Sequence, residues 1–204
     1  MNPIYWFAVK LSRWIGRAFF NYRVLHREYL EVPGGALVVS NHASFVDPPM
    51  VGVAFDEPIH YLARKTLFNN PIGGAIIRAL QAFPVDQDRP DPGSLKNVIR
   101  LLRSGEKVLL FPEGERSWDG KLLPGQPGVG FIIAKAKVPV IPVRLFGTHE
   151  ALPRGGKTIH PAEITVVCGP TWHYDPINYP NLEGKELYQR ISSDLMDRIA
   201  ALHV

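Results

Sequence analysis

The feature that most constrains this chain is a short apolar run that ends in a polar turn containing two prolines. Residues 36–39, Ala-Leu-Val-Val, predict a buried strand. Residues 40–49, Ser-Asn-His-Ala-Ser-Phe-Val-Asp-Pro-Pro, follow directly. Adjacent prolines fit the first turn of a helix and no later position. The sequence therefore predicts a strand, a polar loop and a helix, with the loop where a rigid scaffold presents functional groups.

His42 and Asp47 are the residues of this loop that can carry chemistry. In a continuous helix they would lie about 140° apart around the axis. Pro48 disfavours a helical backbone at Asp47, so we expect Asp47 to be extended and the segment to form a loop. A loop can bring the carboxylate to the imidazole, fix its tautomer and leave the other ring nitrogen to take a proton from a substrate hydroxyl. The alternative is structural, because Asp47 is a good N-cap and Asn41 and Ser44 favour turns.

A second apolar run, residues 108–111, ends in another polar loop, and Leu-Phe-Pro-Glu-Gly-Glu-Arg-Ser spans residues 110–117. The apolar residues predict a buried strand, and α/β folds bind ligands beyond the carboxyl ends of such strands. Gly114 lets the backbone approach a substrate closely, and the planar guanidinium of Arg116 matches phosphate oxygens. Glu113 could accept a hydrogen bond from a substrate hydroxyl or hold Arg116 in place. The alternative for Arg116 is an ion pair with a neighbouring carboxylate.

The remaining periodicity predicts a single α/β domain, in keeping with a length of 204 residues. Further strands are expected at residues 24–32, 59–63 and 164–168. Helices are expected at residues 48–55, 71–82, 92–102, 128–134 and 183–202. The single cysteine excludes an internal disulfide framework, and no His/Cys cluster has metal-ligand spacing. The net charge of +4 suits an anionic partner, but zinc-finger, RNP and long basic motifs that would indicate nucleic acid are missing.

The segment from His42 to Asp47 and the run at residues 111–117 together resemble the glycerolipid acyltransferase family. These lysophosphatidate and glycerol-phosphate acyltransferases share a His-x4-Asp motif and a Phe-Pro-Glu-Gly-Thr-Arg-Ser motif. The resemblance extends in order from about Leu37 to Val143. It implies a mixed sheet covered by helices and no cofactor or metal. It also implies an O-acyltransferase of phospholipid biosynthesis, with acyl-CoA or acyl carrier protein as donor and 1-acylglycerol-3-phosphate as acceptor.

The resemblance also implies roles for individual residues. His42 would remove the proton of the acceptor hydroxyl as that hydroxyl attacks the thioester carbonyl, and Asp47 would orient His42. The substrate-binding residues that it implies are Lys65, Arg89, Glu113, Gly114, Arg116 and Ser117. Arg116, with Lys65 and Arg89, would hold the acceptor phosphate. The alternative for Lys65 is an ordinary solvated lysine at a strand end.

The sequence departs from the family motifs at two places. The family's second motif ends in Asp-Arg, whereas here Gln87 follows Asp86 and the arginine comes later, as Arg89. Arg89 can take the phosphate-binding role only if this loop shifts. Glu115 stands where the family has threonine, and its charge would weaken or retune the preference for the head group.

The amino-terminal residues 1–23 are rich in aromatic and aliphatic side chains and are predicted to form an amphipathic helix that precedes the catalytic domain at residues 24–204. Lys10, Arg13 and Arg17 share one helical face, which argues against a membrane span. An aromatic helix with a basic stripe is typical of an interfacial membrane helix. We therefore expect a peripheral, monotopic protein at the cytoplasmic face of the membrane. The alternative is a helix packed on the core with a solvated basic face.

Three other functions would use the same features differently. A lipid ester or thioester hydrolase would use the His-Asp pair with water as the nucleophile, and an acyltransferase could act on another lysophospholipid or on glycerol 3-phosphate. A non-catalytic membrane-binding protein would need only the basic amino-terminal helix. Product analysis separates the first two, and replacement of His42 separates the third.

Overall fold

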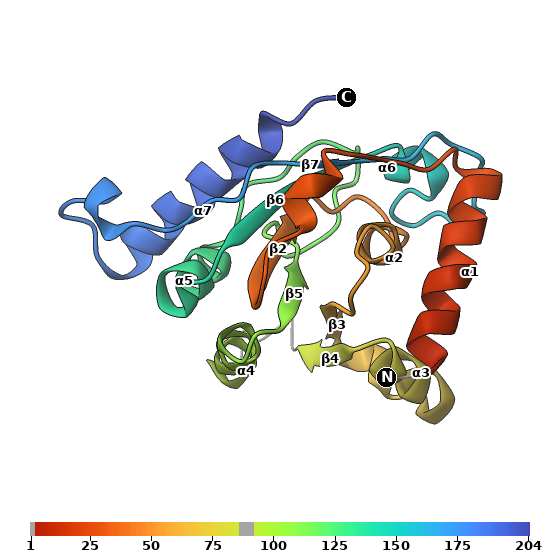
Figure 1. Cartoon of the computed structure of the whole chain (residues 1–204), viewed down its shortest axis with the longest axis horizontal. Coiled ribbons are helices and arrows are strands. Elements are labelled where there is room, and N and C mark those ends of the chain that lie inside the picture. The colour runs from red at the N-terminus through yellow and green to blue at the C-terminus, as the bar shows by residue number, and fades with distance from the viewer. Residues whose placement is uncertain (1–2, 86–91) are drawn as a thin grey trace.

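The structure of the chain, a computed structural model, describes residues 3–85 and 92–204. Seven strands form one sheet in the order β1-β7-β6-β2-β5-β3-β4, with helices on both sides (Figure 1). The strands are β1 (Arg23–Leu25), β2 (Ala36–Ser40), β3 (His60–Arg64), β4 (Ala82–Val85), β5 (Lys107–Leu110), β6 (Val140–Phe146) and β7 (Thr165–Cys168). The helices are α1 (Pro3–Phe19), α2 (Asp47–Gly52), α3 (Pro71–Ala79), α4 (Pro92–Arg103), α5 (Pro127–Ala136), α6 (Thr148–Ala151) and α7 (Gly184–Ala200). Short 3-10 helices are η1 (Arg27–Leu30), η2 (Lys65–Phe68) and η3 (Pro176–Asn178).

The predicted mixed sheet is confirmed. Strands β2 to β6 run parallel to one another, whereas β1 and β7 are parallel to each other and β7 is antiparallel to β6. At the centre, Val38 of β2 lies between Leu109 of β5 and Ile141 of β6. All three side chains are buried. Continuous apolar strands of this kind are expected where helices cover both faces of a parallel sheet.

Two apolar clusters, one on each face, hold the layers together. On one face α1 and α2 lie beside the sheet, and Met50 and Val51 of α2 are packed in its cluster. On the other face α4, α5 and α7 contribute the apolar side chains, among them Val98, Ile132 and Leu195 (Figure 1). The sheet is therefore fixed from both sides, and its carboxyl edge is a rigid base for loops.

The first predicted strand is wrong over most of its length. Residues 24–32 were expected to be extended, but β1 ends at Leu25 and η1 follows. His26 has a left-handed backbone with φ 58°, which turns the chain out of the strand. Arg23 already pairs with β7, so the sheet begins inside the segment assigned to the amino-terminal helix.

Helix α1 is present as predicted and packs through one face only. Tyr5 and Val9 are buried, and Arg13 turns inward to donate hydrogen bonds to the carbonyls of Val53 and Phe55. The predicted basic stripe is therefore only partly solvent-facing. Within residues 3–85 and 92–204, no helix is both long enough and apolar enough to cross a bilayer.

Candidate active site

The candidate active site lies at the carboxyl edge of the parallel strands. Strand β2 ends at Ser40 and leads into the loop that carries His42, and its neighbour β5 ends at Leu110 and leads into the loop at residues 111–117. Because the two strands are adjacent and parallel, both loops emerge side by side. The backbone N–H of Ser117 donates to the carbonyl of His42 over 2.8 Å and ties the loops together.

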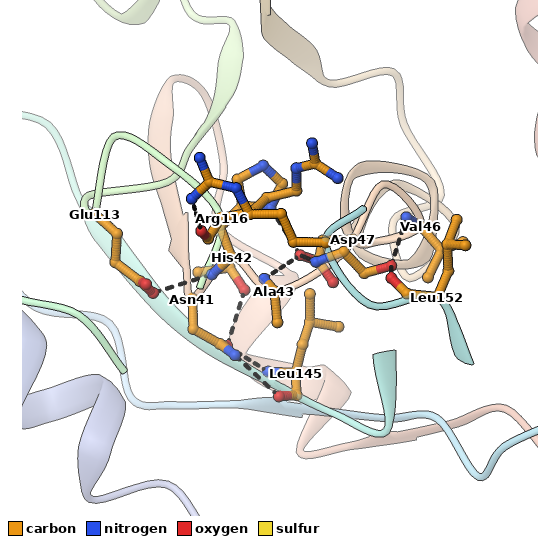
Figure 2. A network of polar contacts seen from close by, with 12 residues as sticks. Asn41, His42, Ala43, Val46, Asp47, Glu113, Arg116, Leu145 and Leu152 are labelled. Carbon is orange, nitrogen blue, oxygen red and sulfur yellow. Dashed lines mark hydrogen bonds and ion pairs between the residues drawn. The ribbon is translucent and has the colours of Figure 1, made fainter. Parts of the chain in front are cut away.

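The structure brings His42 and Asp47 into direct contact (Figure 2). Nδ1 of His42 lies 2.7 Å from Oδ2 of Asp47. The His42 side chain is 18% exposed and that of Asp47 is fully buried. Since Asp47 is a carboxylate acceptor, Nδ1 carries the proton and Nε2 remains as an acceptor facing the cavity that His42 lines. This is the arrangement that a general base requires.

Asp47 is held by more than the imidazole. The same Oδ2 atom accepts hydrogen bonds from the backbone N–H groups of Ala43 and Ser44, each over 2.7 Å. Asp47 is also the first residue of α2 and not an extended residue, so the prediction from Pro48 is wrong at this position. Pro48 is tolerated because it occupies the first turn, where its missing N–H costs no helical hydrogen bond.

The loop is also tied to distant parts of the chain by two buried polar side chains. Asn41 donates to the carbonyl of Leu145 over 3.1 Å and accepts from the N–H of the same residue over 2.7 Å. Ser44 donates to the carbonyl of Leu152 over 2.7 Å and accepts from the N–H of Val46. These contacts, drawn in Figure 2, leave the loop little freedom to move.

Glu113 lies behind the His42 loop and is almost completely buried. Its Oε1 accepts from the N–H of His42 over 3.0 Å (Figure 2). Its Oε2 accepts from the N–H of Leu123 over 3.2 Å. Burial, with the charge of Asp47 nearby, raises the pKa of Glu113 to about 7, although the two backbone hydrogen bonds oppose the rise. Both carboxylate oxygens are thus used on the backbone. This arrangement favours a positioning role over the predicted contact with substrate.

Two aromatic rings flank the polar groups. Phe111 stacks on the imidazole of His42, with 3.9 Å between ring centroids and 14° between planes. Phe45, inside the His-x4-Asp segment, lies under the guanidinium of Arg116 at 3.6 Å from its ring centroid. An aromatic face stabilises a cation placed over it. Phe111 therefore both orients the ring of His42 and favours the imidazolium form that proton abstraction would create.

Arg116 and Arg154 form the cationic side of the site. Nη1 of Arg116 is buried and has no hydrogen-bond partner among the described residues. Burial and the neighbouring charge of Arg154 lower the pKa of Arg116. Arg154 donates to a carboxylate oxygen of Glu115 over 2.7 Å and to the carbonyl of Arg116 over 2.5 Å, and it lies over the ring of Trp118. The neighbouring carboxylate therefore pairs with Arg154 and not with Arg116.

Two cavities meet at this site. A polar cavity of about 480 Å³ is lined by His42, Gly114, Arg116, Arg154 and residues at the ends of β3 and β4. An almost wholly apolar cavity of about 290 Å³ extends among α1, α2, α3 and β3. Both are lined by Phe45, Pro48, Leu62, Ala63 and Leu67. The imidazole therefore lines a compartment that contains charged side chains, and this compartment adjoins an apolar one.

The chain is similar to known acyltransferases over most of its length. Residues 21–145 match the family model described as Acyltransferase. The chain is 31% identical over 182 residues to the 1-acyl-sn-glycerol-3-phosphate acyltransferase of Bacillus subtilis, covering 88% of this chain and 87% of that protein. The chain belongs to the glycerolipid acyltransferase family. It is an O-acyltransferase, as predicted from its two motifs.

The chain is also similar to a plant acyltransferase and to a bacterial acyltransferase of known structure. The chloroplastic 1-acyl-sn-glycerol-3-phosphate acyltransferase BAT2 of Brassica napus is 35% identical over 125 residues, which cover 59% of this chain and 36% of that protein. The crystal structure of the 1-acyl-sn-glycerophosphate (LPA) acyltransferase PlsC from Thermotoga maritima superimposes with a TM-score of 0.74 at 25% identity, covering 98% of this chain and 80% of that chain.

The other predicted substrate residues of this acyltransferase differ in their placement. Gly114 lines the polar cavity with φ +77°, a left-handed backbone that favours glycine. Ser117 is buried, and its hydroxyl donates to Asp119. Lys65 is exposed at the start of η2, whereas its neighbours on either side line the cavity. Arg89 lies outside the described residues.

Sequence reasoning missed several members of the site. Arg154 lies beyond the stretch of family resemblance, in a loop that the sequence indicated only as basic and glycine-containing. Phe111 and Phe45 were inside the quoted motifs, but nothing in their order indicates which polar group each ring covers.

Proposed function

We propose that this acyltransferase transfers a fatty acyl group to the free hydroxyl of 1-acylglycerol-3-phosphate in phospholipid biosynthesis. The donor is an acyl thioester, acyl-CoA or acyl carrier protein. One observation carries the proposal: His42, paired with the buried Asp47, lines a cavity that has arginines in its wall and that adjoins an apolar cavity. The names of the Bacillus and Brassica relatives support the acceptor.

The proposed reaction needs a single base. Nε2 of His42 takes the proton of the acceptor hydroxyl as that oxygen attacks the thioester carbonyl carbon. Asp47 and the ring of Phe111 stabilise the imidazolium that forms. The carbon–sulfur bond then breaks, the sulfur leaves as a thiol after it takes the proton from His42, and the new ester carries the acyl group. The protein ends the cycle in its starting protonation state.

The polar cavity supports recognition of a phosphate. Arg116 presents a planar guanidinium on a cavity wall, and its Nη1 is unused by the described residues. Guanidinium groups bind phosphate oxygens through paired N–H donors. An acceptor anchored there has its hydroxyl close to His42, which lines the same cavity, and positioning of this kind supplies much of the catalytic advantage in two-substrate reactions.

The apolar cavity supports binding of a fatty acyl chain. Its wall is formed by side chains such as Val9, Val53 and Leu80, and its mouth is shared with the polar cavity. Apolar surface gains about 25 cal/mol for each Å² removed from water, so a hydrocarbon chain is favoured there over any polar ligand. We assign this compartment to an acyl chain of donor or acceptor.

We further propose that α1 anchors the enzyme peripherally, as a monotopic protein, at the cytoplasmic face of the membrane. Opposite its buried side, α1 exposes Phe7 (68%), Trp14 (62%), Ile4 (51%) and Leu11 (44%). These positions recur at intervals of three and four and form one apolar stripe. Exposed Lys10 and Arg17 flank it and suit anionic lipid head groups.

The membrane proposal is tested by sedimentation with vesicles. The full chain is expected to bind vesicles that contain phosphatidylglycerol more tightly than pure phosphatidylcholine vesicles. A Phe7→Ser/Trp14→Ser variant should lose most of the binding to both. A Leu202→Ser variant, altered at the other end of the chain, serves as control. Equal binding by the wild type and the double variant would remove α1 from the membrane contact.

The reaction is tested by incorporation of a labelled acyl chain into lysophosphatidate, other lysophospholipids and glycerol 3-phosphate, with acyl-CoA and acyl carrier protein compared as donors. The wild type is expected to form labelled phosphatidate. His42→Ala should lower the rate by about 10³-fold, whereas His203→Ala, an exposed histidine at the carboxyl end, should not. His42-dependent release of free fatty acid alone would replace transfer by hydrolysis. Transfer to a different acceptor would keep the mechanism and change the head group.

A further inference from the structure

Arg154 reaches the active site from outside both family motifs. It follows α6, in the segment that leads toward β7, yet its side chain lines the polar cavity together with His42 and Arg116. It is only 24% exposed. Its guanidinium contacts the carboxylate of Glu115, the carbonyl of Arg116 and the ring of Trp118.

The backbone that carries Arg154 is fixed relative to the base. The buried hydroxyl of Ser44, within the His42 loop, donates to the carbonyl of Leu152 over 2.7 Å. The N–H of Leu152 donates in turn to the carbonyl of Thr148 at the start of α6. Arg154 therefore begins two residues from an anchor on the catalytic loop. A ligand bound by Arg154 would therefore be held at a fixed position relative to His42.

Two guanidiniums and one carboxylate, those of Arg116, Arg154 and Glu115, lie together on the described part of the cavity wall, and Glu115 pairs with Arg154. Once Glu115 is released, the two positive charges of Arg116 and Arg154 match a phosphate monoester, which carries about −1.5 to −2 at neutral pH. A phosphodiester carries only one charge. The charge of Arg154 lowers the pKa of Arg116, so the two guanidiniums repel each other, and an anion shared between them removes that cost.

Glu115 is the partner of Arg154 that is easiest to replace. Its side chain is 62% exposed, so it returns to water at little cost once Arg154 is released. The contact of Arg154 with Trp118, with 4.3 Å from Cζ to the ring centroid, is a cation–π contact and does not depend on Glu115. An incoming phosphate can thus take the place of Glu115 without disturbing this contact.

We infer that Arg154 is a second phosphate ligand that determines head-group specificity, and that Glu115 is its displaceable counter-ion in the empty site. The inference rests on the proposed function, because it concerns the acceptor of that reaction. Arg116 and Arg154 clamp a phosphate monoester between them, and Glu115 swings into solvent. A diester acceptor lacks the second charge and one free oxygen, so it displaces Glu115 poorly. Glutamate at a position where the family has threonine thus sharpens the choice for a monoester.

The test compares Arg154→Ala, Arg154→Lys and Glu115→Gln with Lys157→Ala, an exposed cation of the same loop that does not line the cavity. Steady-state kinetics are measured for lysophosphatidate, for lysophosphatidylglycerol as a diester, and for the donor. Arg154→Ala is expected to raise the KM for lysophosphatidate about 10- to 100-fold, as for loss of a hydrogen bond to a charged group, with kcat and the donor KM nearly unchanged. Arg154→Lys should recover part of the loss.

Glu115→Gln separates a counter-ion from a structural partner. If phosphate displaces Glu115, this variant keeps or lowers the KM for lysophosphatidate and gains activity on the diester. If Glu115 and Arg154 merely fix the loop, both variants lose activity on all acceptors equally, and the inference is overturned. An unchanged acceptor KM in Arg154→Ala also overturns it.

A binding measurement keeps the inference separate from the reaction. Inorganic phosphate should raise the thermal unfolding midpoint of the wild type and of Lys157→Ala, and should raise that of Arg154→Ala much less. If the wild type transfers no acyl group to any acceptor but shows this Arg154-dependent protection, the proposed function fails and the phosphate site stands. Equal protection of wild type and Arg154→Ala removes the phosphate site, whatever the enzyme acylates.

Discussion

The two sides of the active-site cavity are built in opposite ways. On the side of the base, Asp47 is fully buried and one of its oxygens accepts three hydrogen bonds, from the imidazole and two backbone amides. On the side of the head group, Glu115 is largely exposed, and Nη1 of Arg116 has no partner among the described residues. The base is therefore held by buried contacts before substrate arrives, with only Oδ1 of Asp47 left without a hydrogen-bond partner among the described residues, whereas the other side holds its cations with replaceable partners.

This difference separates two kinds of function. Groups that are fixed before substrate arrives pay no reorganisation during the reaction, so changes among them should lower kcat. Groups that exchange partners on binding act through affinity, so changes among them should raise KM. The comparison predicts large, acceptor-independent losses around His42 and smaller, acceptor-dependent losses around Arg116.

The largest loss is expected from Asp47→Asn. Asparagine can keep its one acceptor oxygen at the Oδ2 position, where the imidazole and the two amides converge, but it carries no negative charge to stabilise the imidazolium that proton abstraction creates. We expect kcat to fall by about 10³-fold with every acceptor. Rates are compared with those of Asp197→Asn, an exposed residue of α7. A loss confined to one acceptor would break the comparison, because it would make Asp47 part of head-group recognition.

A smaller loss on the same side is expected from Glu113→Gln. Glutamine has one acceptor oxygen, so it can satisfy the N–H of His42 or that of Leu123 but not both. We expect kcat to fall by about 10- to 100-fold, because leaving one buried N–H without an acceptor costs this much and displaces the loop that carries His42. The KM for lysophosphatidate should change little. A large rise in KM with unchanged kcat would return Glu113 to the substrate contacts predicted from the sequence.

Glu113 also gives the stability of the protein a pH dependence. Its pKa is about 7 in the folded chain and about 4.5 in the unfolded one, so between these values the folded state binds the extra proton. The free energy of unfolding should therefore fall as pH rises from 4.5 to 7, by up to about 3 kcal/mol from this group, and then level off. Chemical denaturation of wild type and Glu113→Gln across this range measures it. Parallel profiles would show that Glu113 is ionised throughout.

The sequence predicted those parts of the site whose residues lie close together along the chain. His42 and Asp47 lie five residues apart in a loop that follows one apolar strand, so their contact could be predicted from the loop itself. The α/β class was predicted from the order of the elements, whereas the mixed sheet was implied by the family resemblance. Two local predictions were wrong. The apolar pattern at residues 24–32 could not reveal that the backbone of His26 is left-handed and ends the strand. The preference of residues before proline for extended backbone could not show that Asp47, whose carboxylate accepts from two backbone amides, would be the first residue of α2.

The head-group side was less predictable because it depends on tertiary contacts. Arg154 meets Glu115 and Arg116 only after β6 and α6 have carried the chain back across the sheet. No spacing in the sequence encodes that meeting. The direction of Glu113 was equally hidden, since adjacent loop residues can face the substrate or the protein. Whether the predicted residues Lys65 and Arg89 contact substrate stays a prediction.

On the head-group side, Arg116→Lys tests how much recognition depends on the shape of the cation. Lysine keeps the charge but loses the planar fork and the stacking on Phe45. We expect the KM for lysophosphatidate to rise about tenfold with kcat nearly unchanged, since one of two parallel hydrogen bonds is lost. Arg100→Lys, at an exposed position of α4, is the matched control. A fall in kcat equal to that of Glu113→Gln would mean that Arg116 belongs to the fixed side.

The smallest effect is expected from a substitution in the apolar cavity. This cavity differs from both the base side and the head-group side, because it would select the length of the acyl chain and not a charge. Ala8 of α1 lines this cavity, and Ala18 lies exposed on the same helix. Ala8→Leu should fill part of the cavity and lower the rate with a 16-carbon thioester relative to a 12-carbon one, whereas Ala18→Leu should not. Each methylene excluded costs about 0.8 kcal/mol, or about fourfold in binding. The loss should therefore grow by steps with chain length and be the same for every head group. A loss that depends on the head group would mean that binding in the apolar cavity is coupled to binding of the phosphate. Residues of the apolar cavity would then have to be counted with those that act through acceptor affinity.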